Sequence, residues 1–187
     1  MALPSFQIEI TEQGWLGTPN GDYDPAVVDL CTHGDIRLVV GGEIIAAGGG
    51  GDGYGISEAA LGLLRTVGSD YERTEDPDGD RLIPHGCGTT LMMGCGIGID
   101  WSVRHLGDQV RLSEVVRYDS ADGANAIRYP GLEVQVASSD YGAEIVAFAE
   151  HAKEPFQGLK KSFSDRRDRR EYKAFWKEYE QLLRAAG

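Results

Sequence analysis

The region from residue 99 to residue 137 constrains the fold most, because apolar and polar residues alternate along it between tight turns. Residues 99–106 and 109–118 alternate on either side of Gly107, and a second pair of alternating segments meets at Pro130-Gly131. Alternation with period 2 is typical of a half-buried strand, and short turns join antiparallel neighbours. The sequence therefore predicts an antiparallel meander in the middle of the chain.

The residues before this meander add further strands. Residues 6–10 alternate with period 2, and residues 35–40 and 43–47 flank a Gly41-Gly42 pair, which supplies the positive φ of a two-residue turn. The glycine-rich segment 85–98 is expected to form a tight entry into the strand that follows it. We expect about six to seven strands from these patterns.

Apolar residues at helical spacing predict three helices. They are residues 58–67 with Ser57 as N-cap, a second helix from Asp140 to Pro155, and a last helix that opens at Ser164 or Asp165.

The last helix carries an apolar stripe that is wide enough to dock on a sheet or on a partner. Its members are Tyr172, Phe175, Trp176, Tyr179, Leu182, Leu183 and Ala186. Helices follow groups of strands along the chain and do not alternate with them, which favours an α+β fold with a mainly antiparallel sheet. A chain of 187 residues is long enough for one well-buried core, so we expect a single domain over residues 1–187.

Charge divides the chain into two unequal parts. From Lys160 onward, nine basic and five acidic residues give +4, whereas residues 1–159 carry nine basic and twenty-five acidic residues, giving −16. An acidic body repels nucleic-acid phosphates and anionic membranes, and it attracts cationic surfaces. We therefore expect a basic protein partner, no nucleic acid and no membrane, with the basic amphipathic helix of residues 160–187 docking on the acidic body.

An acidic loop provides the first candidate for a partner surface. Carboxylates on an exposed loop can pair with the Lys and Arg of a nucleic-acid-processing enzyme and speed its association. The sequence thus predicts a binding module of the immunity or antitoxin type, which inhibits a basic partner protein. The alternative is that the negative charge only keeps the protein soluble and has no specific partner. The first-choice residues are Glu72, Glu75, Asp76, Asp78 and Asp80, followed by Asp52, Asp119 and Asp122.

Cysteine and histidine residues raise the question of a metal site. Zinc takes four ligands in a tetrahedron, but the ligand pairs of structural sites are usually two to four residues apart, and here a single residue separates each pair. We therefore expect no cofactor, with zinc as the metal that these residues could hold and packing as small buried groups as the alternative. The candidate ligands are Cys31, His33, His85, Cys87 and Cys95.

A small thiol- or zinc-dependent enzyme centred on residues 85–95 is the alternative function. Its nucleophile would be Cys87 or Cys95, its base His85 or His105, and Asp100 would orient the base while glycine amides bind an oxyanion. The segment lacks a local signature of a cysteine enzyme, so the sequence favours a binding module over an enzyme.

The sequence also indicates the cellular compartment in which the protein is expected. No apolar run approaches the ~18 residues of a membrane span, and the first residues lack the basic and apolar regions of an export signal. Three cysteines, an odd number, favour thiols or metal ligands over a disulfide framework. A cytoplasmic protein is expected. A purely structural subunit stays open as a third function if the stripe of the last helix is exposed, and the oligomeric state also stays open.

Overall fold

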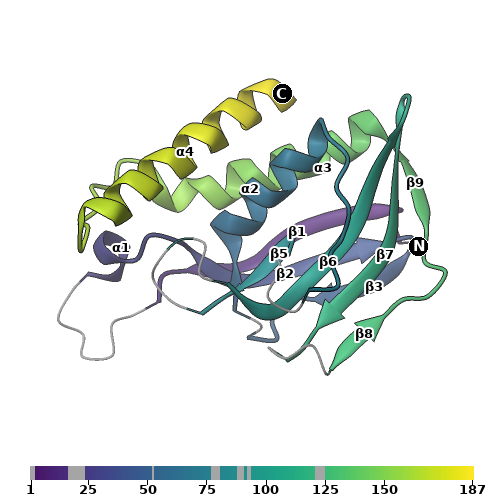
Figure 1. Cartoon of the computed structure of the whole chain (residues 1–187), viewed down its shortest axis with the longest axis horizontal. Helices are drawn as coiled ribbons and strands as arrows, with labels where there is room; N and C mark the ends of the chain where they lie inside the picture. Colours follow the sequence, from purple (N-terminus) through teal and green to yellow (C-terminus); the bar gives the residue numbers. More distant parts are fainter. Residues whose placement is uncertain are drawn as a thin grey trace.

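The computed structural model of the chain describes residues 3–16, 24–51, 53–76, 81–87, 91, 94–120 and 125–187, without the side chains of residues 94 and 95. Within them, nine strands form one mainly antiparallel open sheet, and the long helices gather on one side of it (Figure 1). This architecture confirms the predicted α+β class. The strands are β1 (Phe6–Gly14), β2 (His33–Val40), β3 (Glu43–Ala47), β4 (Tyr54–Gly55), β5 (Ile83–Gly86), β6 (Gly94–Leu106), β7 (Gln109–Tyr118), β8 (Ala126–Arg128) and β9 (Val134–Ala137).

The strand order places segments that are far apart in the sequence next to one another in the sheet. The order is β1-β2-β4-β5-β6-β7-β8, with β3 also paired to β2 and β9 also paired to β7. Two of the three predicted hairpins are present: β2 and β3 turn at Gly41-Gly42, with φ of 59° and 82°, and β6 and β7 turn at Gly107, with φ of 68°. The third, at Pro130-Gly131, was wrong: β8 and β9 each pair with β7 and not with each other. Between the two hairpins that are present lies the two-residue strand β4, which joins β2 to β5.

The helices differ in part from those predicted. They are α1 (Pro25–Val28), α2 (Ile56–Val67), α3 (Ser138–Lys153), the 3₁₀ turn η1 (Glu154–Phe156) and α4 (Arg166–Ala186).

Two of the predicted helix starts were wrong. Gly55, not Ser57, is the N-cap of α2, because the Ser57 hydroxyl instead accepts from the Thr32 N–H and donates to Glu58. Similarly, α3 begins at Ser138 with Ala137 as its cap, ahead of Asp140. The predicted start of α4 is confirmed, since the Asp165 carboxylate accepts from the Asp168 N–H.

The core lies between the sheet and the helices. Trp101 of β6 and Tyr141 of α3 are fully buried, and the Tyr141 hydroxyl lies 2.7 Å from the Thr66 hydroxyl of α2. The apolar stripe of α4 contributes Phe175, Tyr179 and Leu183 to this core, and the Tyr179 hydroxyl donates to the carbonyl of Ala149 on α3 at 2.7 Å. The last helix is thus packed onto the other helices along the face that its sequence makes apolar.

An exposed ion pair also joins α4 to α2. Both guanidinium nitrogens Nε and Nη2 of Arg65 contact the Glu178 carboxylate, at 2.7 and 2.9 Å, and both side chains are more than two-fifths exposed. We expect Glu178→Gln to lower the free energy of unfolding by only about 0.5 kcal/mol, because solvent screens exposed pairs. Urea unfolding at low and high salt checks this: the difference between variant and wild type should vanish at high salt. A difference of several kcal/mol would show that the contact is more than a screened pair.

Candidate metal centre

Four buried polar side chains converge where α1, β2 and α2 meet. Asp29 follows α1, Cys31 lies in the bend after it, His33 is the first residue of β2, and Glu58 lies in the first turn of α2. Their exposed fractions are 0% for Asp29, 1% for Cys31, 7% for His33 and 8% for Glu58. A buried polar group costs free energy unless it is partnered, so this concentration of polar groups requires an explanation.

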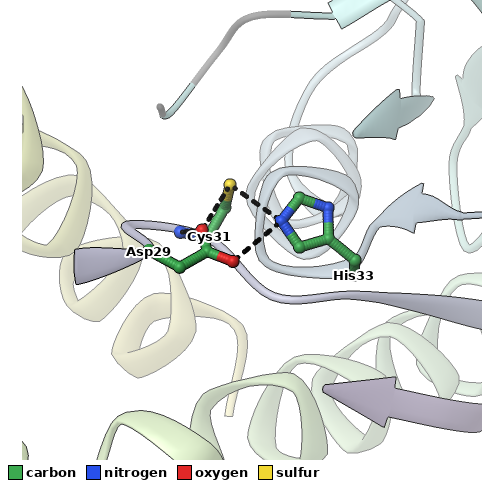
Figure 2. A group of neighbouring side chains, drawn as sticks. All are labelled: Asp29, Cys31 and His33. Atoms are coloured by element: carbon green, nitrogen blue, oxygen red, sulfur yellow. Dashed lines mark hydrogen bonds and ion pairs between the residues drawn. The ribbon is translucent and has the colours of Figure 1, made fainter. Parts of the chain in front are cut away.

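Three of these residues form a compact set, the Asp-Cys-His cluster, defined as Asp29, Cys31 and His33 (Figure 2). The Cys31 Sγ lies 3.4 Å from His33 Nε2 and 3.4 Å from Asp29 Oδ1, and His33 Nε2 lies 3.2 Å from Asp29 Oδ2. One potential ligand atom from each residue lies within 4.8 Å of the others. In a tetrahedral zinc site with bonds of ~2.0–2.3 Å, neighbouring ligand atoms are ~3.3–3.7 Å apart, so the cluster nearly has the spacing of a metal site.

The local chain holds the Asp29 carboxylate in one orientation. Its backbone N–H caps α1 by donating to the Pro25 carbonyl, at 2.9 Å. Its Oδ2 accepts from the Leu16 N–H at 2.8 Å, and its Oδ1 accepts from the Cys31 N–H at 3.1 Å. These bonds leave the carboxylate aimed at the thiol and the imidazole, which are two and four residues further along the chain.

The segment that precedes α4 braces the same loop from outside. The Lys161 ammonium donates to the carbonyls of Asp29 and Ala26, at 2.6 and 2.7 Å, and lies 3.6 Å from the centre of the Trp15 ring. Its pKa is lowered to about 8, mainly by burial. The Ser162 N–H adds a bond to the Val27 carbonyl at 3.0 Å. The loop that carries Asp29 is therefore fixed from both sides.

Electrostatics keep the Cys31 thiol protonated in the absence of a cation. Burial raises the pKa of Cys31 far above its usual value, and the neighbouring carboxylates of Glu58 and Asp29 raise it further. Burial also raises the pKa of Glu58, although the Ser57 hydroxyl donates to it at 2.8 Å. A thiolate nucleophile is strongly disfavoured here. A bound cation would reverse this, because a metal ion deprotonates a coordinating thiol.

The contacts of the His33 ring argue against a catalytic triad. In a triad the nucleophile and the orienting carboxylate use different ring nitrogens, because one nitrogen takes a proton while the other donates one. Here both Cys31 and Asp29 contact Nε2, as the two dashed lines in Figure 2 show. Among the residues that the structure describes, the buried Nδ1 has no hydrogen-bond partner. Three donors that converge on one point suit a metal ion better than proton relay.

A second Cys-His pair lies on the neighbouring part of the sheet. His85 Nδ1 on β5 lies 2.9 Å from the Sγ of Cys87, and Cys87 is exposed. Between them, the backbone of Gly86 packs against the His33 ring: a Cβ on Gly86 would lie 2.3 Å from His33 Nδ1. The structure thus pairs Cys31 with His33 and His85 with Cys87, one pair buried and one at the surface. The side chain of Cys95, the fifth predicted ligand, lies outside the described part of the chain.

The other two predicted catalytic residues belong to separate hydrogen-bond networks. Asp100 is fully buried and accepts from the Leu82 N–H and the Tyr71 hydroxyl, each at 3.3 Å. Burial raises its pKa to about 6. His105 instead bonds through its ring nitrogens to the Asp70 carboxylate and the Val67 carbonyl, each at 3.1 Å. Both residues are therefore held by partners that serve the fold.

The predicted acidic surface is described only in part. Glu72 and Asp76 are exposed. Glu75 lies between two guanidinium groups: Arg128, with an Nη2–Oε2 distance of 2.8 Å, and Arg73. Hydrogen bonds from Arg128 and Arg73 lower its pKa to about 2. Its charge is thus already paired within the chain.

Of the remaining acidic candidates, only Asp119 belongs to the part of the chain that the structure describes. The Asp119 carboxylate accepts from Arg117 Nε at 2.7 Å. The other four lie outside the described residues: Asp52, Asp78, Asp80 and Asp122.

Sequence reasoning missed two members of the buried group. Asp29 could have been found, because Asp29, Cys31 and His33 alternate with period 2, which places their side chains on one side of an extended chain. Glu58 offered no such signal. It lies in the apolar first turn of α2, and only the packing of α2 against β2 brings it beside Cys31.

Comparisons of the chain with family models, with curated proteins and with solved structures found no match. Among the described helices, none is both long and apolar enough to cross a membrane.

Proposed function

We propose that this protein binds one Zn²⁺ ion at the Asp-Cys-His cluster. The observation that carries the proposal is the convergence of a carboxylate oxygen, a thiol sulfur and an imidazole nitrogen within 4.8 Å in a buried position. Sulfur, nitrogen and oxygen in this combination are typical zinc ligands, and a divalent cation would also balance the buried carboxylates.

The ion would have a structural role. Catalytic zinc sites keep one position open to water and substrate, whereas the three proposed ligands here are at most 7% exposed. Glu58 is the candidate for the fourth ligand, because its carboxylate hydrogen-bonds Cys31 and interacts electrostatically with His33. Zinc at this point would tie α1, β2 and α2 into one rigid junction.

Equilibrium dialysis against Zn²⁺ followed by elemental analysis tests this proposal. Wild-type protein should retain one zinc per chain, and Cys31→Ser and His33→Gln should each lose it. Cys87→Ser is the matched control, since it removes an exposed thiol outside the cluster and should keep the zinc. Wild type that emerges without zinc, or Cys31→Ser that retains it, would rule out the site.

Gly86→Ala provides a test that leaves every ligand in place. Its added Cβ would lie 2.3 Å from Nδ1 and 2.9 Å from Cε1 of His33, so the ring must leave the position in which Nε2 contacts Cys31 and Asp29. We expect zinc affinity to fall by about 10- to 100-fold, the usual effect of disturbing a metal-binding histidine, as measured by competition with a chromophoric chelator. Gly14→Ala is the control, because a Cβ there meets nothing within 4 Å. Equal affinities in the two variants would contradict the assigned role of His33.

Binding of a basic protein is a second proposal, supported by the charge of −16 over residues 1–159 and by the exposure of Glu72 and Asp76. We propose that these two residues contact the partner, in the manner of an immunity protein. A partner captured from the source cell and then purified should bind Glu72→Lys/Asp76→Lys at least about tenfold more weakly, with the loss mainly in the association rate. Glu75→Gln is the control, because the Glu75 charge is already paired. Unchanged binding of the double variant would remove this surface from consideration.

A further inference from the structure

We propose that three arginines, Arg73, Arg81 and Arg128, form a binding site for a phosphoryl group, and that the Glu75 carboxylate occupies this site when no ligand is bound. These three residues are called the arginine cluster below. The inference concerns residues outside the Asp-Cys-His cluster and does not depend on zinc binding.

The strand register places the arginine cluster around the end of β7. Arg128 lies on β8, at the edge of the sheet beside β7 (Figure 1), and it is paired directly with Val116. Directly paired residues share a face of the sheet, and so do residues two apart on one strand, so Arg128 and Tyr118 lie on the same face. Arg73 Nη1 donates to the Tyr118 hydroxyl at 3.1 Å, and the Arg81 guanidinium lies 4.2 Å from the centre of the Tyr118 ring. Three segments that are distant in the sequence thus bring their arginines to one aromatic side chain.

Two of the three guanidinium groups are buried. Arg81 is 5% exposed, and the side chain of Arg73 is 8% exposed. Among the described residues, Arg81 donates to the carbonyls of Thr74 and Asp76 but forms no ion pair with a carboxylate. The Asp100 carboxylate acts on Arg81 only from beyond ion-pair distance. A buried charge is costly unless it is paired, so the arginine cluster has room for a further negative charge.

Unused hydrogen-bond donors lead to the same conclusion. The Nε atoms of Arg73 and Arg81 are both buried, and neither has a hydrogen-bond partner in the part of the chain that the structure describes. Most buried polar atoms in folded proteins have such a partner, and those that lack one require an explanation. A bound oxyanion provides it, because its oxygens are strong acceptors.

The Glu75 carboxylate marks the place of the anion. Nη1 and Nη2 of Arg128 donate to its Oε1 and Oε2, at 3.1 and 2.8 Å, and Nη2 of Arg73 also contacts Oε1. A guanidinium fork binds phosphate oxygens with the same two parallel bonds. The Glu75 side chain is 60% exposed and belongs to a segment without regular secondary structure, so it can turn into solvent and leave its place to a ligand.

A phosphoryl group suits the arginine cluster better than a carboxylate ligand does. A carboxylate would only replace Glu75, which the chain already holds in place. A phosphoryl group instead brings close to two negative charges at neutral pH and three acceptor oxygens. The extra charge and the extra oxygen supply what the two buried guanidinium groups lack.

Calorimetric titration at constant ionic strength tests the proposal, with inorganic phosphate and O-phosphoserine as separate probes. Glu75→Gln should bind phosphate at least about tenfold more tightly than wild type, because it removes the charge that competes for the site. Arg128→Gln should bind at least about tenfold more weakly, the scale of losing a charge-assisted hydrogen-bonded pair. Arg128→Lys should also lose affinity, since it keeps the charge but not the fork. The expected gain in Glu75→Gln cannot result from misfolding.

Glu178→Gln and Arg104→Gln are the matched controls. Each removes one exposed charge that is ion-paired elsewhere, with Arg65 and with Asp70, and each should bind phosphate like wild type. The two probes distinguish the source of the phosphoryl group: tighter binding of O-phosphoserine indicates a phosphorylated molecule, whereas equal or tighter binding of inorganic phosphate indicates the free ion.

Three results would overturn the phosphoryl site. The first is that neither wild type nor Glu75→Gln binds either probe. The second is that Glu75→Gln gains no affinity, or gains no more than Glu178→Gln, which would reduce the effect to overall charge. The third is that Arg128→Gln and Arg128→Lys bind phosphate as tightly as wild type. None of these results bears on the zinc site, because the ligands of the two sites do not overlap.

Discussion

Saturating Zn²⁺ should raise the free energy of unfolding of the wild-type protein by about 4 kcal/mol when the free ion is present at about a thousand times its dissociation constant. The reason is linkage: the folded chain presents Asp29, Cys31 and His33 together, whereas the unfolded chain holds no preformed site. Denaturant unfolding at two zinc concentrations and in the presence of a chelator measures the effect.

Variants of the two described cysteines separate a specific site from general binding to thiols. Cys31→Ser should unfold at the same denaturant concentration with and without zinc, since it removes the buried sulfur. Cys87→Ser should keep the full zinc-dependent gain, because its thiol is exposed and lies outside the cluster. A gain of similar size in Cys31→Ser would place the stabilising ion elsewhere on the chain.

Asp100→Asn should stabilise the protein by up to about 3 kcal/mol at pH 7 to 8, converted from the pKa shift at 1.4 kcal/mol per unit. Burial raises the pKa of Asp100 from 3.8 to about 6, so its ionised form costs free energy in the folded state. The cost is complete above pH 6 and disappears as the pH falls towards 3.8, because the folded protein then binds the proton more tightly than the unfolded chain.

The pH dependence is the measurement that checks this prediction. The stability difference between Asp100→Asn and wild type should be largest above pH 6 and should shrink towards zero near pH 4. Asparagine keeps the shape of the side chain and can still accept from the Leu82 N–H. Glu133→Gln, at an exposed position, should change stability by less than about 0.5 kcal/mol at any pH. A constant difference across the pH range would show that the Asp100 carboxyl does not titrate as described.

The parts of the fold that the sequence predicts best are those with local signals. Gly41-Gly42 and Gly107 adopt positive φ and turn two of the three predicted hairpins, because only a residue without a side chain enters that conformation readily. The strands β4 and β5 were missed. Each is short and ends in a glycine, and each depends on partners far along the chain, such as the pairing of Tyr54 with His85.

The candidate site shows the same limit at the level of single residues. Cys31 and His33 were predicted as ligands from their type, but the pairing of His33 with Gly55 and the docking of α2 decide which groups they meet. The two Cys-His pairs were grouped as one ligand set, whereas the backbone of Gly86 separates a buried pair from an exposed one. No sequence spacing encodes which of two such pairs faces the core.

X-ray absorption at the zinc edge tests the central claim most directly, because it reads the ligand atoms themselves. For zinc-loaded wild type we predict one sulfur neighbour at ~2.3 Å and the remaining neighbours nitrogen or oxygen at ~2.0–2.2 Å. The sulfur neighbour should disappear in Cys31→Ser and persist in Cys87→Ser. A wild-type spectrum without sulfur, or a sulfur neighbour that survives in Cys31→Ser, would contradict a zinc site formed by Asp29, Cys31 and His33.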